Sequence, residues 1–289
     1  MIAVDIILAG LILGGMYAMV ALGLTLQYGV ARIINLAYGE ILLAGAFGTY
    51  WLYSAHAVSP LVGIFLLVPV AFVANWAIYV FLLTPLVDRA KSRDQLEGDS
   101  ILFTFGLLFV LQGVGLAVFG GGIYGYPYRQ TAVDLFGTTV AANRLLAASI
   151  ALAIGVLLYL GLTRTRIGMA FRAVAADPNA ARLVAIDVPR LSGLAFAAGG
   201  ALCAAAGVLI SMSQTFTVSG GVLFTMKALV IVIMGGVGNL AGTLVAGLLL
   251  GVVEVAVMRF DPGLTLAANF VIFLAVLIFR PTGIFGRSA

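Results

Sequence analysis

The chain has 289 residues, of which 63% are hydrophobic and only 9% are charged, and its mean hydropathy is +1.19. These values exclude an ordinary soluble domain and indicate a polytopic membrane protein. The formal net charge of +4 comes from arginines in polar segments, so it reports on membrane topology and lipid contacts and predicts no nucleic-acid partner. The single cysteine, Cys203, excludes an intramolecular disulfide and a cysteine-based metal cluster.

The first half of the chain contains apolar runs of unequal length. A bilayer core about 30 Å thick needs about 20 apolar residues of helix, and Asp5 stands where a signal peptide needs positive charge, so we expect a retained first span. The runs cover 2–26, 41–53, 61–83 and 101–119. The segment 28–40 is too polar to face lipid and too apolar for an ordinary loop, which predicts a broken or re-entrant piece buried in protein.

Polar connections divide the rest of the chain. A charged loop is expected at 88–99, and a connection rich in glycine and tyrosine at 121–137 suits the outer headgroup level. Further apolar runs follow at 145–162, 191–212, 227–240, 245–257 and 266–279. A basic tail closes the sequence at 280–289.

Positive charge sets the expected topology. Basic residues gather at 88–99, at 164–190 and in the tail, and such segments favour the cytoplasmic side. Even numbers of apolar runs separate these three segments, and three crossings precede the first, so the N-terminus is expected outside and the C-terminus in the cytoplasm. The sequence therefore predicts an all-α membrane protein with eight or nine transmembrane helices, some short or broken, in one transmembrane domain over residues 1–289.

The segment 164–190 is the longest polar interruption and holds five of the fifteen basic residues. Asp177 followed by Pro178 predicts a helix start, because aspartate caps free N–H groups and proline suits the first helical position. Ala180, Leu183 and Val184 then share one face, until Pro189 discourages continuation. This apolar stripe suits docking to another protein; packing on the inner ends of the spans, or lying in the headgroup layer, is an equal alternative.

Residues suited to catalysis are scarce. The chain has one histidine, His56, which we interpret as an interfacial residue, and it contains no HExxH or GxSxG motif. Neither of its two lysines follows a glycine, so the phosphate-binding loop of nucleotide hydrolases is missing. We therefore expect no enzyme activity, no catalytic residues and no metal or nucleotide site in this chain.

Ionisable groups at membrane depth are costly and indicate functional sites. Glu40, Lys227 and Glu254 are the candidates. Each also has a structural alternative: Lys227 could extend to the outer headgroups, Glu254 could lie near the inner surface, and Glu40 could cap a half-helix.

The 36 glycines serve two expected purposes. Gly10 and Gly14, and the series Gly242, Gly247 and Gly251, have spacings that allow close helix crossing. By contrast, Gly235, Gly236 and Gly238, followed by Asn239, favour unwinding within a membrane segment, which is tolerated beside protein or a water-lined path. Together with Asn35, Gly39 and Glu40, they give interrupted segments in both halves, a pattern associated with substrate sites in other transporters.

Four stretches resemble the permease subunits of branched-chain amino-acid ABC importers. They are GGMYAMVALGLTLQYGVARIINLAYGE at 14–40, GMAFRAVAADPNAARLVAIDV at 168–188, MGGVGNLAGTLVAGLLLGVVE at 234–254 and RPTGIFG at 280–286. The likeness runs nearly end to end, is highly specific for the family and weakly specific for the substrate. In size the chain is similar to the shorter of the two paralogous permeases that such importers pair.

This resemblance implies a heteromeric importer in a bacterial inner membrane. Its expected partners are a second permease, two cytoplasmic ATPases and a periplasmic or lipid-anchored solute-binding protein, with ATP and magnesium bound by the ATPases and no cofactor bound by this chain. The segment 164–190 would be the cytoplasmic coupling loop. Coupling is assigned to Arg172, Asp177, Pro178, Ala181, Leu183, Val184 and Ile186. The translocation path is assigned to Asn35, Gly39, Glu40, Lys227, Gly235, Gly236, Gly238 and Asn239.

Departures from the family pattern bear on the solute. Tyr38 stands where many relatives have histidine, Ala185 where glycine is usual, and Asn239 where serine is common. The implied solute is a branched-chain amino acid (leucine, isoleucine or valine) or a related small amino acid or amide. One alternative is an ion-coupled secondary transporter or channel, with Lys227, Glu40 and Glu254 as a relay. Another is a non-transporting structural subunit or a membrane enzyme.

Overall fold

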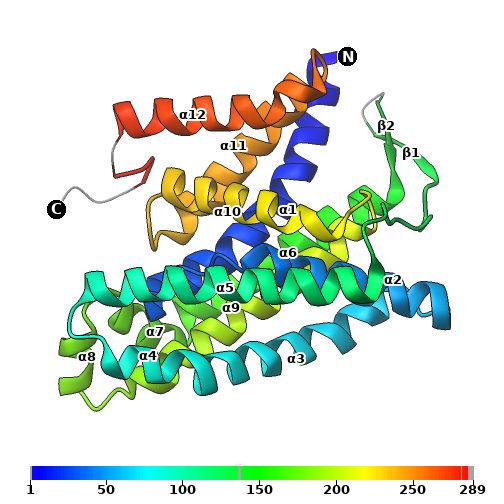
Figure 1. Cartoon of the computed structure of the whole chain (residues 1–289). Helices are drawn as coiled ribbons and strands as arrows, with labels where there is room; N and C mark the ends of the chain where they lie inside the picture. The colour runs from blue at the N-terminus through cyan, green and yellow to red at the C-terminus, as the bar shows by residue number, and fades with distance from the viewer. Residues whose placement is uncertain (1, 136–137, 281, 286–289) are drawn as a thin grey trace.

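The computed structural model describes residues 2–135, 138–280 and 282–285, and helices dominate this part of the chain (Figure 1). The helices are α1 (Ile2–Ala31), α2 (Tyr38–His56), α3 (Pro60–Ile78), α4 (Thr84–Arg89), α5 (Arg93–Phe119), α6 (Ala142–Arg164), α7 (Arg166–Ala176), α8 (Pro178–Leu183), α9 (Val188–Ser211), α10 (Gly221–Gly235), α11 (Leu240–Met258) and α12 (Thr265–Phe279). A π-helical segment, η1 (Tyr79–Leu83), joins α3 to α4, and two short 3-10 helices are η2 (Val218–Gly220) and η3 (Pro262–Leu264). Within these described residues, eight helical segments are long and apolar enough to cross a membrane. The predicted polytopic helical class is confirmed.

Two helices occupy the centre of the bundle. Within their most apolar 18-residue stretches, 83% of α9 and 67% of α1 is buried, against 6% of the η3–α12 segment and 11% of α5. Helices α1, α2 and α3 all pack against α9, and α11 packs along α1. The outer helices therefore present their apolar side chains to lipid or to a partner.

Glycines bring α1 and α11 close together, as their spacing predicted. A Cβ atom on Gly14 would lie 2.8 Å from the Gly247 carbonyl oxygen, and one on Gly10 would lie 2.5 Å from the Val252 Cα. With no hydrophobic driving force between helices in lipid, such close backbone packing is a main source of association.

The three basic segments lie at one end of the bundle. In Figure 1 the α4–α5 connection, α7 and α8, and the end of α12 lie at the left, whereas the N-terminus, the end of α2 and the β hairpin lie at the right. This arrangement agrees with the even numbers of crossings counted from the sequence. Which side of the membrane each end faces stays a prediction, and residues 286–289 of the tail lie outside the described part.

The structure corrects two of the predicted connections. The loop expected at 88–99 is only residues 90–92, because the Ser92 side chain accepts a hydrogen bond from Gln95 N and starts α5 at Arg93, eight residues before the apolar run that begins at 101. The outer connection contains an antiparallel hairpin, β1 (Ala132–Leu135) and β2 (Thr138–Ala141). An otherwise all-α fold thus carries two short strands that the sequence pattern did not indicate.

Tyrosines attach this outer connection to the helices. Tyr124 and Phe216 exchange backbone hydrogen bonds of 2.8 and 2.9 Å, and Tyr53 donates to the Pro127 carbonyl. Burial raises the pKa of Tyr126 to about 12, with a smaller opposing effect from its hydrogen bond to Ser211, so the phenol stays protonated at neutral pH. The outer cap is therefore a packed structure.

Candidate translocation and coupling sites

Helix α8 begins as the sequence predicts. Asp177 Oδ1 accepts hydrogen bonds from Asn179 N at 2.8 Å and Ala180 N at 3.2 Å, and Pro178 occupies the first turn. An aspartate cap satisfies N–H groups that the helix itself leaves free. The predicted helix start at Asp177 and Pro178 is confirmed.

The end of α8 differs from the prediction. The helix stops at Leu183, because Ala185 adopts a left-handed conformation with φ of +60°, which ends the turn. Pro189 lies in the first turn of α9, which the Asp187 side chain caps by accepting from Arg190 N at 3.2 Å. Helix α8 therefore has only six residues and lies between two longer helices, α7 and α9.

The residues assigned to coupling divide into two groups. Leu183 and Val184 are exposed, at 88% and 69%, although both are large and apolar. Ala181 is buried and Ile186 packs beside it, in a cluster with Phe171 of α7. Ala181 and Ile186 thus hold the segment on the bundle, and Leu183 and Val184 form its free apolar surface.

Helix α7, which the sequence pattern did not reveal, fastens this surface to the membrane helices. Phe171 and Val174 face the same cluster as Leu26 and Val30 of α1. The Arg172 guanidinium is exposed and donates to the Thr163 carbonyl at 3.4 Å. The amphipathic spacing of 166–176 was the sequence signal for this helix, but its arginines made the segment look like part of a polar loop.

A second contact joins α7 to the irregular segment after α1. The Arg32 guanidinium donates to the Ala175 carbonyl at 2.5 Å, and Arg32 itself has a φ of +58° where α1 ends. This hydrogen bond therefore connects α7 directly to the segment 32–37.

The irregular piece that the sequence predicts at 28–40 is shorter in the structure, where residues 32–37 separate α1 from α2 and alternate between buried and partly buried. Asn35 is fully buried and donates to Gln27 Oε1 at 3.3 Å, while its own oxygen accepts from Ala37 N at 3.1 Å. Thr104 of α5 accepts from Leu36 N at 3.1 Å. Side chains thus take the place of water as hydrogen-bond partners of backbone groups that no helix satisfies. An irregular segment at membrane depth requires such partners.

The start of α2 packs against the start of α10. Gly39 N donates to Thr225 Oγ1 at 2.8 Å, and a Cβ atom on Gly39 would lie 2.6 Å from the Gly221 carbonyl carbon. The Glu40 side chain points at Gly221; the residue is 5% exposed, and its Oε1 has no hydrogen-bond partner among the described residues. An unpaired carboxyl oxygen is thus held between two helix N-termini.

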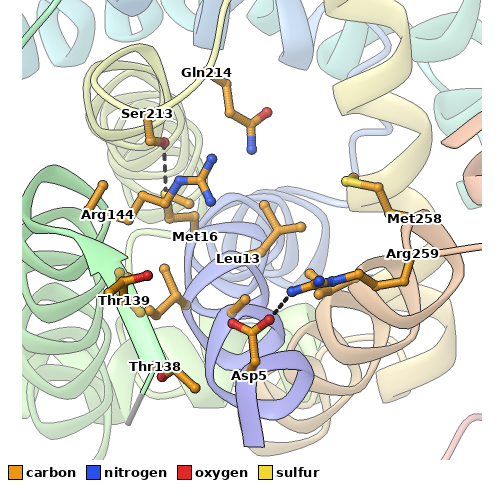
Figure 2. Close-up of a pocket in the computed structure, with 15 residues that line it drawn as sticks. Asp5, Leu13, Met16, Thr138, Thr139, Arg144, Ser213, Gln214, Met258 and Arg259 are labelled. Atoms are coloured by element: carbon orange, nitrogen blue, oxygen red, sulfur yellow. Dashed lines mark hydrogen bonds and ion pairs between the residues drawn. The ribbon is translucent and has the colours of Figure 1, made fainter. Parts of the chain in front are cut away.

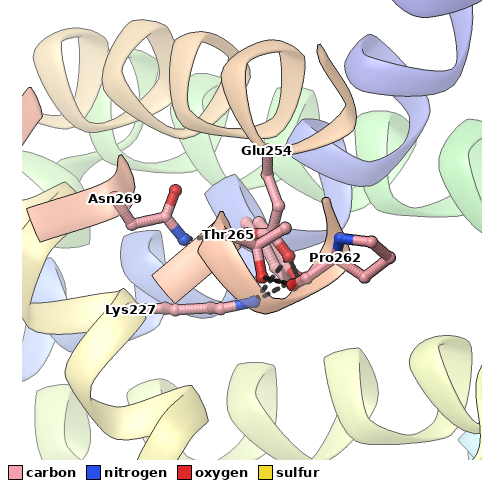
Figure 3. Close-up of polar contacts among 6 residues, drawn as sticks. Lys227, Glu254, Pro262, Thr265 and Asn269 are labelled. Carbon is pink, nitrogen blue, oxygen red and sulfur yellow. Dashed lines mark hydrogen bonds and ion pairs between the residues drawn. The ribbon is translucent and has the colours of Figure 1, made fainter. Parts of the chain in front are cut away.

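Lys227 and Glu254 pair with each other. Lys227 Nζ lies 2.7 Å from Glu254 Oε1 and donates to the Tyr17 hydroxyl at 2.7 Å, and Tyr17 donates to the same carboxylate oxygen at 2.9 Å. Asn269 donates to Glu254 Oε2 at 2.9 Å, and Figure 3 shows the side chains of Lys227, Glu254 and Asn269 converging. The network joins α1, α10, α11 and α12, so the two charges are paired with each other across helices.

The glycine cluster forms a turn between two helices and does not unwind a single span. Gly236 and Gly238 have positive φ values of +96° and +79°, and the Asn239 side chain caps α11 by accepting from Gly242 N at 3.0 Å. Asn239 also donates to the Phe285 carbonyl at 2.8 Å, which holds the C-terminal residues against the turn. Gly235 packs against the backbone of Gly242. The interrupted segment that meets Gly39 and Glu40 is instead the start of α10.

A cavity of about 610 Å³ opens at the other end of the bundle (Figure 2). Its walls come from α1, α11, β2, the start of α6 and the residues after α9. The lining residues include Asp5, Ile12, Leu13, Met16, Thr138, Thr139, Arg144, Ser213, Gln214, Met258 and Arg259. Asp5 and Arg259 form an ion pair across it.

Several of these residues lay outside the sequence predictions. Tyr17 and Asn269 are polar residues within apolar runs, and this position was the sequence signal that could have identified them. The adjacent Gly220 and Gly221 mark the irregular start of α10. Arg144 stands at an expected outer end, where the positive-inside tendency disfavours arginine.

Comparison with known proteins gives one family over almost the whole chain. The family described as "Branched-chain amino acid transport system / permease component" matches residues 6–280. No solved structure matches the chain.

Individual relatives agree with this match. The high-affinity branched-chain amino acid transport system permease protein BraD of Pseudomonas aeruginosa is 28% identical over 96% of this chain and 94% of its own length. The corresponding LivH protein of Escherichia coli is 27% identical, with the same coverage. The probable branched-chain amino acid transport permease protein LivM of Methanocaldococcus jannaschii is 25% identical over 98% of this chain and 94% of its own length.

Proposed function

This chain belongs to the branched-chain amino acid transport permease family, and from that premise we propose that it is one membrane-spanning subunit of an ATP-driven importer. Its solute is a branched-chain amino acid or a related small amino acid or amide. The chain itself neither binds nor hydrolyses nucleotide; ATP and magnesium belong to partner ATPases. It acts as a passive gate that those ATPases move.

The observation that carries this proposal is the exposed apolar surface of α8. Leu183 and Val184 are largely exposed at the end of the bundle that also carries the basic segments, and that end suits the cytoplasm. Exposed apolar side chains away from lipid indicate a protein partner. A groove on a cytoplasmic ATPase is the occupant that fits the family.

Force applied to α8 has a defined route into the spans. Ala181 and Ile186 pack on α7, and Arg32 joins α7 to the irregular segment that holds Asn35. Closure of the ATPases would move α7 and α8 as one body and shift residues 32–37, and with them the meeting point of α2 and α10. The residues proposed to line the path are Asn35, Gly39, Glu40, Lys227, Gly235, Gly236, Gly238 and Asn239.

The remaining partners follow from the family. A second, paralogous permease completes the membrane part, two ATPases bind below it, and a periplasmic or lipid-anchored solute-binding protein delivers the solute from outside. The assembly lies in the bacterial inner membrane, with lipid around the outer helices.

Reconstitution with the partner subunits tests this function. We expect uptake of labelled L-leucine to require ATP and all subunits, and the Leu183→Asp/Val184→Asp double variant to abolish stimulation of ATPase activity by the loaded binding protein. Lys91→Glu, an exposed change at the same end, is the control and keeps coupling. Uptake driven by a proton or sodium gradient without ATP would establish the secondary-transporter alternative instead.

A further inference from the structure

The cavity in Figure 2 has the size and the mixed lining of a small-molecule site. Its volume of about 610 Å³ lies within the range of ligand pockets, roughly 300–1,000 Å³. Ile12, Leu13 and Met16 give one wall an apolar surface, and Ser213 and Gln214 contribute polar groups from the residues after α9. Such a combination suits a solute with one charged end and one aliphatic end.

Arg144 is the charged group in this lining that has no ion-pair partner among the described residues. Asp5 and Arg259 neutralise each other, whereas the Arg144 guanidinium extends toward the space between Ser213 and Gln214. A guanidinium offers a planar pair of donors that matches a carboxylate. The cavity therefore has a net preference for an anionic group.

The position of Arg144 argues against a purely structural role. It lies in the first turn of α6, where the helix dipole disfavours a cation. Its end of the bundle is also the one that the positive-inside tendency leaves poor in arginine. Neither helix stability nor membrane topology accounts for a positive charge at this place.

The floor of the cavity leads toward the buried polar network. Leu13 and Met258 line the cavity, and Tyr17 and Glu254 lie four residues further into the same helices, about one helical turn deeper. The Lys227–Glu254 network is not part of the lining and therefore lies about one helical turn beyond it.

We propose that this cavity is the outer solute site of the permease, where Arg144 binds the carboxylate of an amino acid and the wall of Ile12, Leu13 and Met16 receives its aliphatic side chain. The inference rests on the proposed function and adds to it a place and a residue for recognition. It also requires that the solute occupy the permease between release by the binding protein and passage inward.

Protection of an introduced thiol tests the site without relying on transport. Because Cys203 is fully buried, Gln214→Cys gives this chain one reactive cysteine in the cavity. In the assembled, reconstituted transporter we expect L-leucine to slow labelling by a membrane-impermeant maleimide. L-Leucinamide, which lacks the carboxylate, should protect at concentrations at least about tenfold higher, since a charge-assisted hydrogen bond is lost.

Variants of Arg144 complete the test. Combined with Gln214→Cys, Arg144→Gln should remove the difference between L-leucine and L-leucinamide, and Arg144→Lys should keep part of it. Thr131→Cys, an exposed hairpin residue outside the lining, should be labelled without protection. Basal ATPase activity, measured in each preparation, reports that the assembly is intact.

Three results would overturn the inference, and they differ from failure of the proposed function. If the wild-type assembly imports L-leucine but L-leucine gives no protection, the cavity is not a solute site. If L-leucine protects equally with Arg144→Gln, Arg144 does not bind its carboxylate. Protection that depends instead on anionic lipid in the vesicles would assign Arg144 to headgroup binding. If the complete assembly imports no amino acid, the proposed function itself fails, and the inference fails with it.

Discussion

At the scale of single residues, the paired charges Lys227 and Glu254 show how the membrane environment decides what a side chain does. A lone charge at membrane depth is strongly unfavourable, and here each charge has the other within 2.7 Å. Tyr17 and Asn269 satisfy further carboxylate positions. The arrangement suits a structural role, in which these polar side chains hold four helices together, better than a role in relaying ions.

This view predicts the effect of breaking the pair. Lys227→Met should lower the free energy of unfolding by about 3 kcal/mol, because it leaves the Glu254 carboxylate buried without its cation. We expect a matching fall in the denaturation midpoint of the purified protein in detergent. The double variant Lys227→Met/Glu254→Gln, which removes both charges, should recover most of that loss. A double variant as unstable as the single one would contradict this structural role.

Ala185 offers a second prediction at this scale. Its φ of +60° is disfavoured for residues with a Cβ atom. Ala185→Gly should therefore stabilise the protein by about 0.5–1 kcal/mol, after the greater flexibility of glycine in the unfolded chain is subtracted. Ala180→Gly, an exposed helical position three residues into α8, is the matched control and should destabilise by a similar amount. Thermal unfolding of both variants measures the difference.

At the scale of elements, the contact between the starts of α2 and α10 depends on Gly39. A Cβ atom there would meet the Gly221 backbone and the Thr225 hydroxyl, and the backbone cannot move away cheaply. Gly39→Ala should lower stability by about 1–3 kcal/mol through overpacking. Gly220→Ala, where the added atom would find its nearest neighbour at 3.5 Å, should be close to neutral. Chemical denaturation of the two variants compares them, and equal midpoints would refute tight packing at this contact.

The elements also show what sequence alone can predict. Apolar length located the spans, and the Asp177 cap located the start of α8, because both are local signals. The early start of α5 and all of α7 were missed, because charged residues in the first turns obscured helices whose inward faces are apolar. The contact between the starts of α2 and α10 was not predicted, since spacing shows where a helix is interrupted and not which segment it meets. Asn269 within an apolar run and Arg144 at an expected outer end carried sequence signals, but their partners became visible only once distant segments came together.

At the scale of the whole molecule, the arrangement of the ends determines how force and solute can meet. The exposed surface of α8 lies at one end and the cavity at the other, and α1 and α9 cross the bundle between them. A permease that ATPases move from one side, and that receives solute from the other side, needs these two surfaces at opposite ends of the bundle. It also requires that the α8 end face the cytoplasm, since ATP is found there.

Single cysteines measure that orientation directly. Cys203 is fully buried, so a cysteine introduced at an exposed position is the reactive thiol of this chain. His56 is the last residue of α2, at the cavity end, and Lys91 lies in the short connection at the α8 end; both residues are exposed. In intact cells whose outer membrane has been made permeable, we expect an impermeant maleimide to label His56→Cys at once, and Lys91→Cys only after the inner membrane is opened. An odd number of crossings separates the two positions, because α3, η1 and α4 form one continuous span, so labelling both from the same side would contradict the fold. Labelling with the two sides exchanged would leave the fold intact but put α8 outside the cell, where no ATPase could bind it.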